Sequence, residues 1–308
     1  MKKALIFGIS GFAGGYLARE LVSSGYEVAG SDIIPCSTED ISFIRGDILS
    51  PEAVREIINS SGVDTVINLA AVSSVGASWK MPQTTVSMNV IGSLNILEAA
   101  RMQKTPPAVM LVGSSEEYGA SSLPLREDFP LAPENPYGIA KMTQESFAAL
   151  YRRHYGMKIF CVRPFNHTGV GQKDSFVLPG FCRQAAIAEK SGAPAVIRVG
   201  DISVKRDFSH VRDIVRAYRM ILEKGSCDKV YNVGSGKAYG LEELLRYVIS
   251  LTSQEITVET DPERLRPSDV PVVCCDRSLI TSELGWEPEY TVFDALDELY
   301  LNYLKEIK

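Results

Sequence analysis

Three residues in the middle of the chain have side chains that can move a proton at a carbonyl or alcohol oxygen. Tyr137 and Lys141 are four positions apart, so on a helix their side chains would share one face. An ammonium group beside a phenol favours the phenolate, so Lys141 would lower the pKa of Tyr137 and allow proton exchange near neutral pH. Ser114 can hydrogen-bond the same oxygen. Together with a nicotinamide that supplies or takes a hydride, this set suits oxidation or reduction at a C–OH/C=O centre.

A glycine-rich turn near the start of the sequence predicts the site of such a cofactor. The apolar run Ala4–Phe7 leads directly into Gly8-Ile9-Ser10-Gly11-Phe12-Ala13-Gly14, and helical periodicity follows from Tyr16 to Ser24. The three glycines leave room for the backbone to approach a pyrophosphate at the positive N-terminus of the helix, with Phe12 and Ala13 beside it. Such glycines also occur in ordinary strand-to-helix turns, but the flanking strand and helix favour dinucleotide binding.

The ends of the next strands add further predicted cofactor contacts. Asp32 ends the second apolar run, where a carboxylate can accept hydrogen bonds from both ribose hydroxyls of NAD and repel the 2′-phosphate of NADP. It therefore favours NAD(H), with NADP(H) as the alternative, although an aspartate here is also common in turns. Asp47 and Ile48 could reach the adenine, although an aspartate in this place is as often the cap of a helix that begins near Ser50. The small residues of Leu69-Ala70-Ala71 would let the dinucleotide lie close, although small residues also simply pack.

Strand-like runs alternate with helix-like segments along the first half of the chain. The runs are Ala4–Phe7, Tyr26–Ala29, Ser42–Arg45, Thr65–Leu69, Ala108–Val112 and Lys158–Val162, and the helical segments include Tyr16–Ser24, Pro51–Ser60, Val86–Gln103 and Tyr137–Tyr155. This order predicts an α/β fold of the Rossmann type, with a doubly wound parallel sheet over residues 1–165. A smaller C-terminal α/β lobe over residues 166–308 would bind the substrate, while Val230–Val233 would return to the main sheet.

Composition and charge exclude several other classes of protein. The chain has 308 residues, 45% of them hydrophobic, and a net charge of −6, so it can bury a core but offers no basic surface for a nucleic acid. No apolar stretch approaches the length that crosses a membrane. The six cysteines have no Cys-x-x-Cys spacing and the three histidines are scattered, which favours a reducing cytoplasm and predicts no metal site.

Taken together, the motifs resemble the extended short-chain dehydrogenase/reductase family over nearly the whole chain. The resemblance rests on the glycine turn, Asn68-Leu69-Ala70-Ala71, Asn89-x-x-Gly92, Ser114 and Tyr137-x-x-x-Lys141. It implies the Rossmann fold, catalytic roles for Ser114, Tyr137 and Lys141, and cofactor contacts from Asn89, Tyr137 and Lys141. It also implies a homodimer, because relatives pair the helices that correspond to Val86–Arg101 and Gln144–Tyr155; packing of these helices on the sheet alone is the alternative.

Further segments are most similar to those of family members that act on GDP-linked sugars. These segments are residues 11–14, 113–119, 165–167, 206–208 and 266–268. The similarity implies reduction of a GDP-4-keto-6-deoxy sugar at C4 or, as the alternative, dehydration of GDP-mannose. In the dehydratases a glutamate at the place of Glu116 removes a proton from the sugar, but their glycine turn typically has Gln-Asp where this chain has Phe12-Ala13. An epimerase and a non-catalytic dinucleotide sensor on the same fold stay open.

Substrate contacts are predicted after the sixth strand and in the smaller lobe. Asn166 and Ser115 would contact the GDP-sugar by resemblance, with a turn asparagine as the alternative for Asn166. Arg206 and Arg266 lie in family-like loops, and guanidinium geometry suits a bidentate grip on a diphosphate, although an isolated arginine is more often solvated. Glu117 is expected to be a solvated or structural carboxylate, because its one-residue offset should turn it away from the preceding Glu116.

Overall fold

A computed structural model describes residues 2–36, 38, 41–121, 124–265 and 270–307, and its centre is a parallel β-sheet. Seven strands in this part of the chain follow the order β10-β6-β5-β4-β1-β2-β3. Their bounds are β1 Lys3–Phe7, β2 Glu27–Asp32, β3 Ser42–Arg45, β4 Thr65–Asn68, β5 Ala108–Val112, β6 Ile159–Pro164 and β10 Val230–Val233. The strand order reverses beside β1, so the loops after β1 and β4 diverge there and leave the site at which doubly wound sheets bind ligands. The predicted fold class is confirmed.

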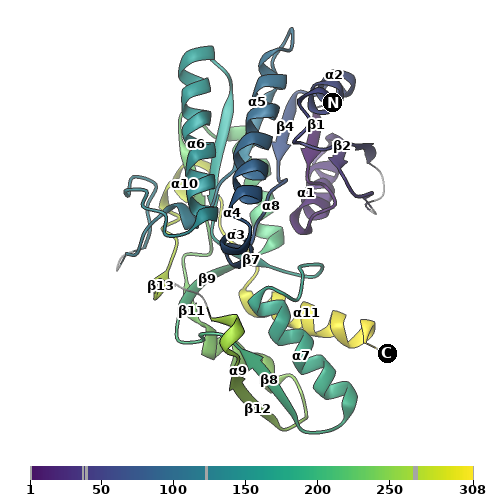
Figure 1. The fold of residues 1–308 in the computed structure, drawn as a ribbon, viewed down its shortest axis with the longest axis vertical. Coiled ribbons are helices and arrows are strands. Elements are labelled where there is room, and N and C mark those ends of the chain that lie inside the picture. The colour runs from purple at the N-terminus through teal and green to yellow at the C-terminus, as the bar shows by residue number, and fades with distance from the viewer. Residues whose placement is uncertain (1, 37, 39–40, 122–123, 266–269, 308) are drawn as a thin grey trace.

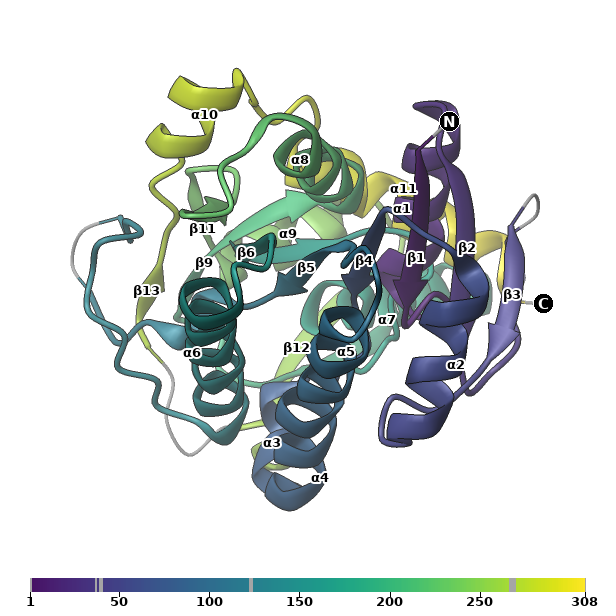
Figure 2. The ribbon, with the colours of Figure 1, turned by 90° about the horizontal axis from the view of Figure 1, so that it is seen from above.

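Helices cover both faces of this sheet because the side chains of each strand alternate between two apolar layers. Ala4 and Ile6 of β1 pack with α1 (Phe12–Ser23) and α8 (Val211–Lys224). Leu5 and Phe7 pack on the other face with α2 (Pro51–Ser61), α5 (Gly92–Arg101) and α6 (Pro136–Tyr155). Figure 2 shows α2, α5 and α6 on one side of the strands and α8 on the other.

Local sequence explains where the two helices with the clearest boundaries begin and end. Ser50 caps α2 by accepting a hydrogen bond from the backbone N–H of Ala53 at 3.2 Å, and Gly62 ends it at φ 54°. Asn135 caps α6 in the same way, Pro136 opens its first turn, and Gly156 ends it at φ 65°. These caps fix the start of α6, the helix that carries Tyr137 and Lys141.

A second, smaller layer of structure packs below the carboxyl ends of the strands (Figure 1). It contains β7 Asn166–Thr168, α7 Val177–Ser191, β8 Ala195–Val199, β9 Lys205–His210, β11 Ala238–Gly240, α9 Leu241–Ser250, β12 Ile256–Thr260, β13 Val272–Val273 and α11 Val292–Glu306. Strand β9 lies between β11 and β13 and also pairs with β7, while β8 pairs with β12. Phe181, Leu244 and Leu299 belong to its own hydrophobic core.

The segment before α5 differs from the predicted continuous helix Val86–Gln103. It consists of α3 (Val75–Lys80), α4 (Pro82–Val86) and a π-helical turn, η1 (Ser87–Ile91), that leads into α5. The wider turn breaks the 3.6-residue period, which sequence periodicity alone does not reveal. The other connecting elements are the 3-10 turns η2 (Ser115–Glu117) and η3 (Pro262–Arg264) and the helix α10 (Ser278–Leu284). None of the helices in the described ranges has the length and apolar character needed to cross a membrane.

Candidate active site

The three predicted catalytic residues meet at the carboxyl end of β5. Ser114 follows the strand and caps η2, accepting from the backbone N–H of Glu116 at 3.1 Å. The side chains of Ser114 and Tyr137 are hydrogen-bonded to each other. Lys141 Nζ lies 5.9 Å from the centre of the Tyr137 ring and donates to the backbone oxygen of Val112 at 2.7 Å. Strand β5 and the first two turns of α6 therefore bring the three side chains together.

Burial sets the protonation of this group more strongly than the predicted effect of the lysine. Burial raises the pKa of Tyr137 well above its usual value, and the hydrogen bond with Ser114 opposes that shift. Burial lowers the pKa of Lys141 to about 8, against the charge of Glu117, which raises it. The pKa of Tyr137 is therefore raised overall, so the net lowering expected from Lys141 is not met. At neutral pH the phenol keeps its proton.

A pocket beside these residues gathers three of the predicted substrate or catalytic positions. Its lining includes Ser115, Glu116, Asn135 and Arg206. The carboxylate of Glu116 accepts a hydrogen bond from Asn135 Nδ2 at 2.8 Å, while Asn135 Oδ1 accepts from the backbone N–H of Gly138 at 2.9 Å. Asn135 thus joins Glu116 to the start of α6. Sequence reasoning missed this residue, although an asparagine before Pro136 is a recognisable helix cap.

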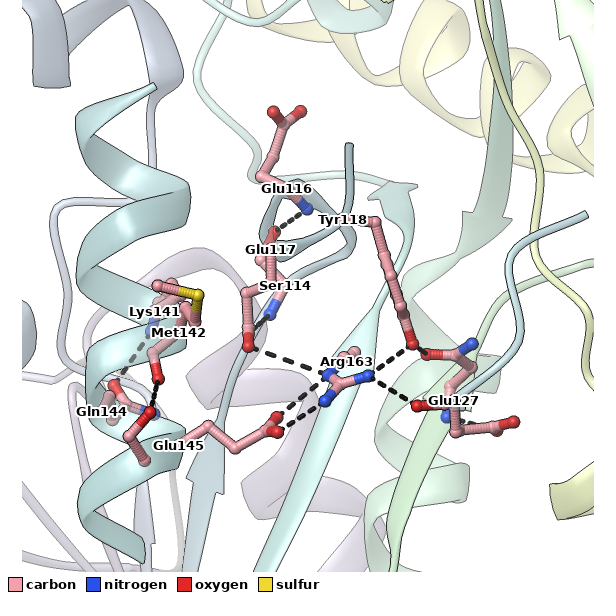
Figure 3. Close-up of polar contacts among 12 residues, drawn as sticks. Ser114, Glu116, Glu117, Tyr118, Glu127, Lys141, Met142, Gln144, Glu145 and Arg163 are labelled. Carbon is pink, nitrogen blue, oxygen red and sulfur yellow. Dashed lines mark hydrogen bonds and ion pairs between the residues drawn. The ribbon is translucent and has the colours of Figure 1, made fainter. Parts of the chain in front are cut away.

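Glu117, the neighbour of Glu116, is completely buried beneath the site rather than solvated. Its Oε1 accepts from the backbone N–H of Ser114 at 2.7 Å, and its Oε2 lies 3.7 Å from Arg163 Nε (Figure 3). The expectation that it points away from Glu116 agrees with this placement, but the solvated alternative is wrong. A single turn of 3-10 helix turns successive side chains by about a third of a circle, which sends Glu117 inward.

The glycine turn has the backbone geometry that a dinucleotide pyrophosphate requires. Gly8 has φ 81°, and a Cβ there would be 2.5 Å from the backbone nitrogen of Ala70. A Cβ on Gly14 would be 2.3 Å from the backbone oxygen of Ile9. Gly11 is the N-cap of α1 and has no side chain that could accept hydrogen bonds from the first N–H groups of the helix. The first turn of α1 also has no acidic residue. The N-terminus of α1 is therefore available to an anion. The residues of the glycine turn fit the pyrophosphate of a dinucleotide cofactor.

Asp32 lies where the second strand passes the glycine turn. Its Oδ2 accepts from the backbone N–H of Ser10 at 3.2 Å and its Oδ1 from that of Ile33 at 2.7 Å. The half-buried side chains of Leu69, Ala70 and Ala71 form the facing loop after β4. The structure thus brings Asp32, the glycine turn and this loop to one edge of the sheet.

Three other predicted cofactor contacts are placed differently. Asp47 is exposed after β3 and accepts from the backbone N–H of Leu49 at 2.9 Å; Ser50 caps α2, so the capping alternative for Asp47 is wrong. Ile48 is buried against α5, where a Cβ on Gly92 would be 2.3 Å from it. Asn89 is fully buried and uses both ends of its amide on the backbone of Val72, at 2.9 and 3.1 Å. The side chains of Ile48 and Asn89 are therefore buried, and their contact with a cofactor stays a prediction.

The remaining predicted residues lie on or next to β7 and β9 of the smaller layer. Phe12 stacks on His167 with ring centres 6.1 Å apart, which places Ala13 and the glycine turn beside β7, where Asn166 is the first residue. Arg206 is the second residue of β9; its Nη1 donates to the backbone oxygen of Lys205 at 2.8 Å. Arg266 lies outside the described residues.

Comparisons with known proteins agree over the full length of the chain. A sequence profile described as GDP-mannose 4,6 dehydratase matches residues 5–299. The GDP-6-deoxy-D-mannose reductase of Pseudomonas aeruginosa is 29% identical over 310 residues, covering 100% of this chain and 99% of the relative. A GDP-mannose 4,6-dehydratase of Vibrio cholerae is 28% identical over 354 residues, covering 99% and 94%. A solved structure of RMD from Pseudomonas aeruginosa, complexed with NADPH, has a TM-score of 0.88 at 28% identity and covers 100% of both chains.

Proposed function

The chain belongs to the GDP-mannose 4,6-dehydratase family of short-chain dehydrogenases/reductases, and we propose that it reduces the C4 keto group of a GDP-4-keto-6-deoxy sugar, forming GDP-D-rhamnose. The observation that carries this proposal is the buried phenol of Tyr137, which keeps its proton beside Ser114. A general acid must be protonated in order to deliver a proton to a ketone oxygen. The resting state of the site therefore suits reduction.

Reduction of a ketone needs one hydride at carbon and one proton at oxygen. A reduced nicotinamide dinucleotide, when bound on the glycine turn, supplies the hydride to C4. Tyr137 donates its phenolic proton to the keto oxygen, and Ser114 hydrogen-bonds the same oxygen. The charge of Lys141 stabilises the phenolate that is left, until Tyr137 takes a proton from solvent. The products are the sugar alcohol and the oxidised cofactor.

The length of the chain supports a reductase over a dehydratase. The alignment with the Pseudomonas reductase spans 310 positions for a chain of 308 residues and so is nearly free of gaps. The alignment with the Vibrio dehydratase extends over 354 positions, so that enzyme contains insertions that this chain lacks. The smaller lobe, with Arg206 on the pocket wall, is proposed to bind the GDP-sugar.

Dehydration of GDP-mannose is the second candidate, and Glu116 favours it. Its carboxylate lies in the pocket lining and accepts a hydrogen bond from Asn135, so a carboxylate base is present close to Ser115 and Tyr137. A base in this place can remove a proton from the sugar and allow water to leave. The same proton-transfer set would then serve both reactions, and only the added carboxylate would distinguish them.

We propose NAD(H) as the preferred cofactor because of Asp32. Its carboxylate is fixed by Ser10 and Ile33 at the end of β2, where the adenosine ribose of a dinucleotide would lie. A carboxylate accepts hydrogen bonds from ribose hydroxyls and repels a 2′-phosphate. The solved relative binds NADPH, so Kd values for NADH and NADPH, measured by protein fluorescence, decide between the two.

A homodimer is proposed from the exposed apolar surface of the α3–α6 side. Large apolar side chains are exposed there on α3, α4, η1 and α6: Trp79, Val86, Ile91, Ile139 and Leu150. Figure 2 shows α3, α4, α5 and α6 grouped on one side of the molecule. Exposed apolar groups in one region mark interaction surfaces, and a twofold dimer would bury them against the same helices of a second copy.

One assay separates the candidate reactions. The purified protein is incubated with GDP-mannose or with its 4-keto-6-deoxy derivative, each with NADH or NADPH, and the products are identified by NMR. Reduction of the keto-sugar with stoichiometric oxidation of the cofactor is expected. Conversion of GDP-mannose into a keto-deoxy product without net cofactor oxidation would replace the reductase assignment with a dehydratase. A change of configuration at C4 would indicate an epimerase, and no turnover of either sugar would favour a non-catalytic sensor.

A further inference from the structure

A polar side chain interrupts the apolar face with which α6 packs on the sheet. The buried residues of α6 after its first turn are Ala140, Lys141, Gln144, Ala148 and Tyr151, so Gln144 occupies a place where an apolar side chain would pack. It is 2% exposed. A buried amide is costly unless its polar atoms have hydrogen-bond partners. The partners of Gln144 therefore indicate why an amide lies at this position.

Gln144, Lys141 and the end of β5 form a closed ring of hydrogen bonds. Lys141 Nζ donates to the backbone oxygen of Val112 at 2.7 Å and to Gln144 Oε1 at 3.4 Å. Gln144 Nε2 donates to the same backbone oxygen at 3.2 Å. This oxygen thus receives as many donors as it has lone pairs. The ring holds the ammonium group against the strand that ends two residues before Ser114.

Only one orientation of the Gln144 amide satisfies this ring. Exchanging its oxygen and nitrogen would set a donor against the Lys141 ammonium and an oxygen against the backbone oxygen of Val112. The hydroxyl of Ser93 is a second donor within reach of Gln144 Oε1, at 3.1 Å, but it also lies 2.7 Å from the backbone oxygen of Asn89. One hydroxyl proton serves one acceptor at a time, so Gln144 Oε1 depends on Lys141 whenever Ser93 turns to Asn89.

The hydrogen bonds continue from Ser93 toward the glycine turn. Ser93 is 2% exposed, and its Oγ accepts from Asn68 Nδ2 at 3.1 Å. Asn68 Oδ1 accepts in turn from the backbone N–H of Ala70 at 3.1 Å. Ala70 belongs to the loop that faces Gly8. Buried hydrogen bonds therefore connect Lys141 both to the end of β5 and to the loop beside the glycine turn.

A lysine needs such restraint if its charge is to act at one place. Its ammonium is a point charge on a long, flexible stem. Two of the three N–H groups of Lys141 have acceptors within the described residues, Val112 and Gln144, and the third is left for groups bound in the site. Without Gln144 a single acceptor would remain, and the ammonium could swing about it.

We propose that Gln144 is a positioning residue of this active site, whose side-chain amide fixes the ammonium group of Lys141 at the end of β5, beside the ring of Tyr137. The proposal deepens the reductase function and rests on it for the activity measurement. The charge of Lys141 stabilises the phenolate left on Tyr137, and this stabilisation depends on the distance between the two groups. Gln144 therefore acts on the rate of proton transfer rather than on the binding of the sugar.

The test is steady-state kinetics of Gln144→Met, which keeps the length of the side chain and removes both polar ends. We expect kcat for the keto-sugar to fall about tenfold, the effect of losing one hydrogen bond to a charged group. KM is expected to change little, because the described residues that line the pocket do not include Gln144. A wild-type kcat in Gln144→Met would overturn the proposal.

Gln184→Met is the matched control, because Gln184 of α7 also uses its amide on the protein backbone. Its Nε2 donates to the oxygen of Gly180 at 3.0 Å, and its Oε1 accepts from the N–H of Arg198 at 2.8 Å. The same substitution there removes a glutamine amide far along the chain from Lys141. We expect wild-type kcat per folded molecule, with folding checked by circular dichroism. An equal fall of kcat in both variants would contradict the proposal.

A measurement without substrate separates this proposal from the function on which it rests. In protein labelled with ¹³C-lysine, NMR relaxation of the carbon next to Lys141 Nζ gives its order parameter, and the signal is assigned from its loss in Lys141→Arg. The order parameter is expected to fall in Gln144→Met and not in Gln184→Met. If the wild-type protein reduces no keto-sugar but this difference is found, the reductase function fails and the positioning stands. Equal order parameters in all three proteins would overturn it.

Gln144→Asn replaces Gln144→Met if the latter does not fold. Asparagine keeps an amide on α6, but its side chain is one carbon too short to reach both Lys141 and the backbone oxygen of Val112. The same loss of order at Lys141 is therefore expected. An order parameter equal to that of the wild-type protein would overturn the proposal.

Discussion

Replacing Asn135 by Ala removes two contacts that one side chain makes at the start of α6. Asn135 Oδ1 accepts from the backbone N–H of Gly138 at 2.9 Å, and Nδ2 donates to Glu116 Oε2 at 2.8 Å. Loss of a helix N-cap costs about 1 kcal/mol. Loss of the second hydrogen bond costs about another 1 kcal/mol, because Glu116 is partly exposed and can exchange its donor for water. We therefore expect the free energy of unfolding to fall by about 2 kcal/mol.

The assay is chemical denaturation followed by circular dichroism, at one fixed protein concentration because dimerisation would make the midpoint concentration-dependent. Asn135→Asp is the matched variant. Aspartate caps a helix as well as asparagine does, so this variant is expected to lose less stability than Asn135→Ala. An Asn135→Ala protein that unfolds at the same denaturant concentration as wild type would refute the argument, since neither contact would then contribute.

The same pair of variants separates the two candidate reactions. Asn135→Asp keeps the cap of α6, and so the placement of Tyr137, but gives Glu116 a neighbouring negative charge instead of a donor. For a reductase, kcat is expected to stay within about threefold of wild type because Glu116 takes no part in proton transfer at C4. For a dehydratase, kcat is expected to fall by about 10²-fold, the lower end of what a positioned base contributes.

Three further outcomes are expected. Tyr137→Phe should lower reductase kcat by about 10²-fold or more while the Kd for NADH changes little, since the phenol supplies the proton; full activity by the spectrophotometric NADH assay would exclude Tyr137 as the acid. Asp32→Ala should weaken NADH binding and leave NADPH binding unchanged or tighter, measured by fluorescence titration; equal weakening of both would contradict a contact with the ribose. The double variant Ile91→Glu, Leu150→Glu should be a monomer by light scattering, because two charges would enter the proposed interface; a persistent dimer would place the interface elsewhere.

Strand positions could be predicted closely because their sequence signal is local. Ser42–Arg45, Ala108–Val112 and Val230–Val233 have the predicted bounds, since each is a short run of strand-forming residues between turn signals. Helix α1 begins at Phe12 rather than at the predicted Tyr16. Glycines at positions 14 and 15 weaken the helix propensity there, but the close approach of Gly14 to the backbone of Ile9 leaves no room for a side chain. The closeness of Gly14 and Ile9 arises only in the folded turn, so helix propensity alone does not predict where α1 begins.

The direction of a side chain was harder to predict than its place in the sequence. Asp32 and Asn89 both fit cofactor motifs. Asp32 borders the glycine turn, whereas the side-chain amide of Asn89 hydrogen-bonds the backbone of Val72 at both ends. Burial was the other quantity that sequence reasoning missed. A lysine four residues after a tyrosine predicts a lowered phenol pKa, but Tyr137 is buried, and the cost of burying a phenolate raises the pKa instead.

The segment from Ser114 to Glu117 shows why the chemistry of proton transfer and the identity of the reaction are separable. In one short turn, Ser114 lies beside Tyr137, Glu116 lines the pocket and is hydrogen-bonded to Asn135, and Glu117 turns inward to accept a hydrogen bond from the backbone of Ser114. Reduction needs the first of these placements, whereas dehydration needs the second as well. Because Glu116 is held from α6 through a single amide, its activity as a base can be changed without disturbing Ser114 or Lys141. A change of reaction within this fold therefore requires alterations at the pocket wall and none in the buried proton-transfer set.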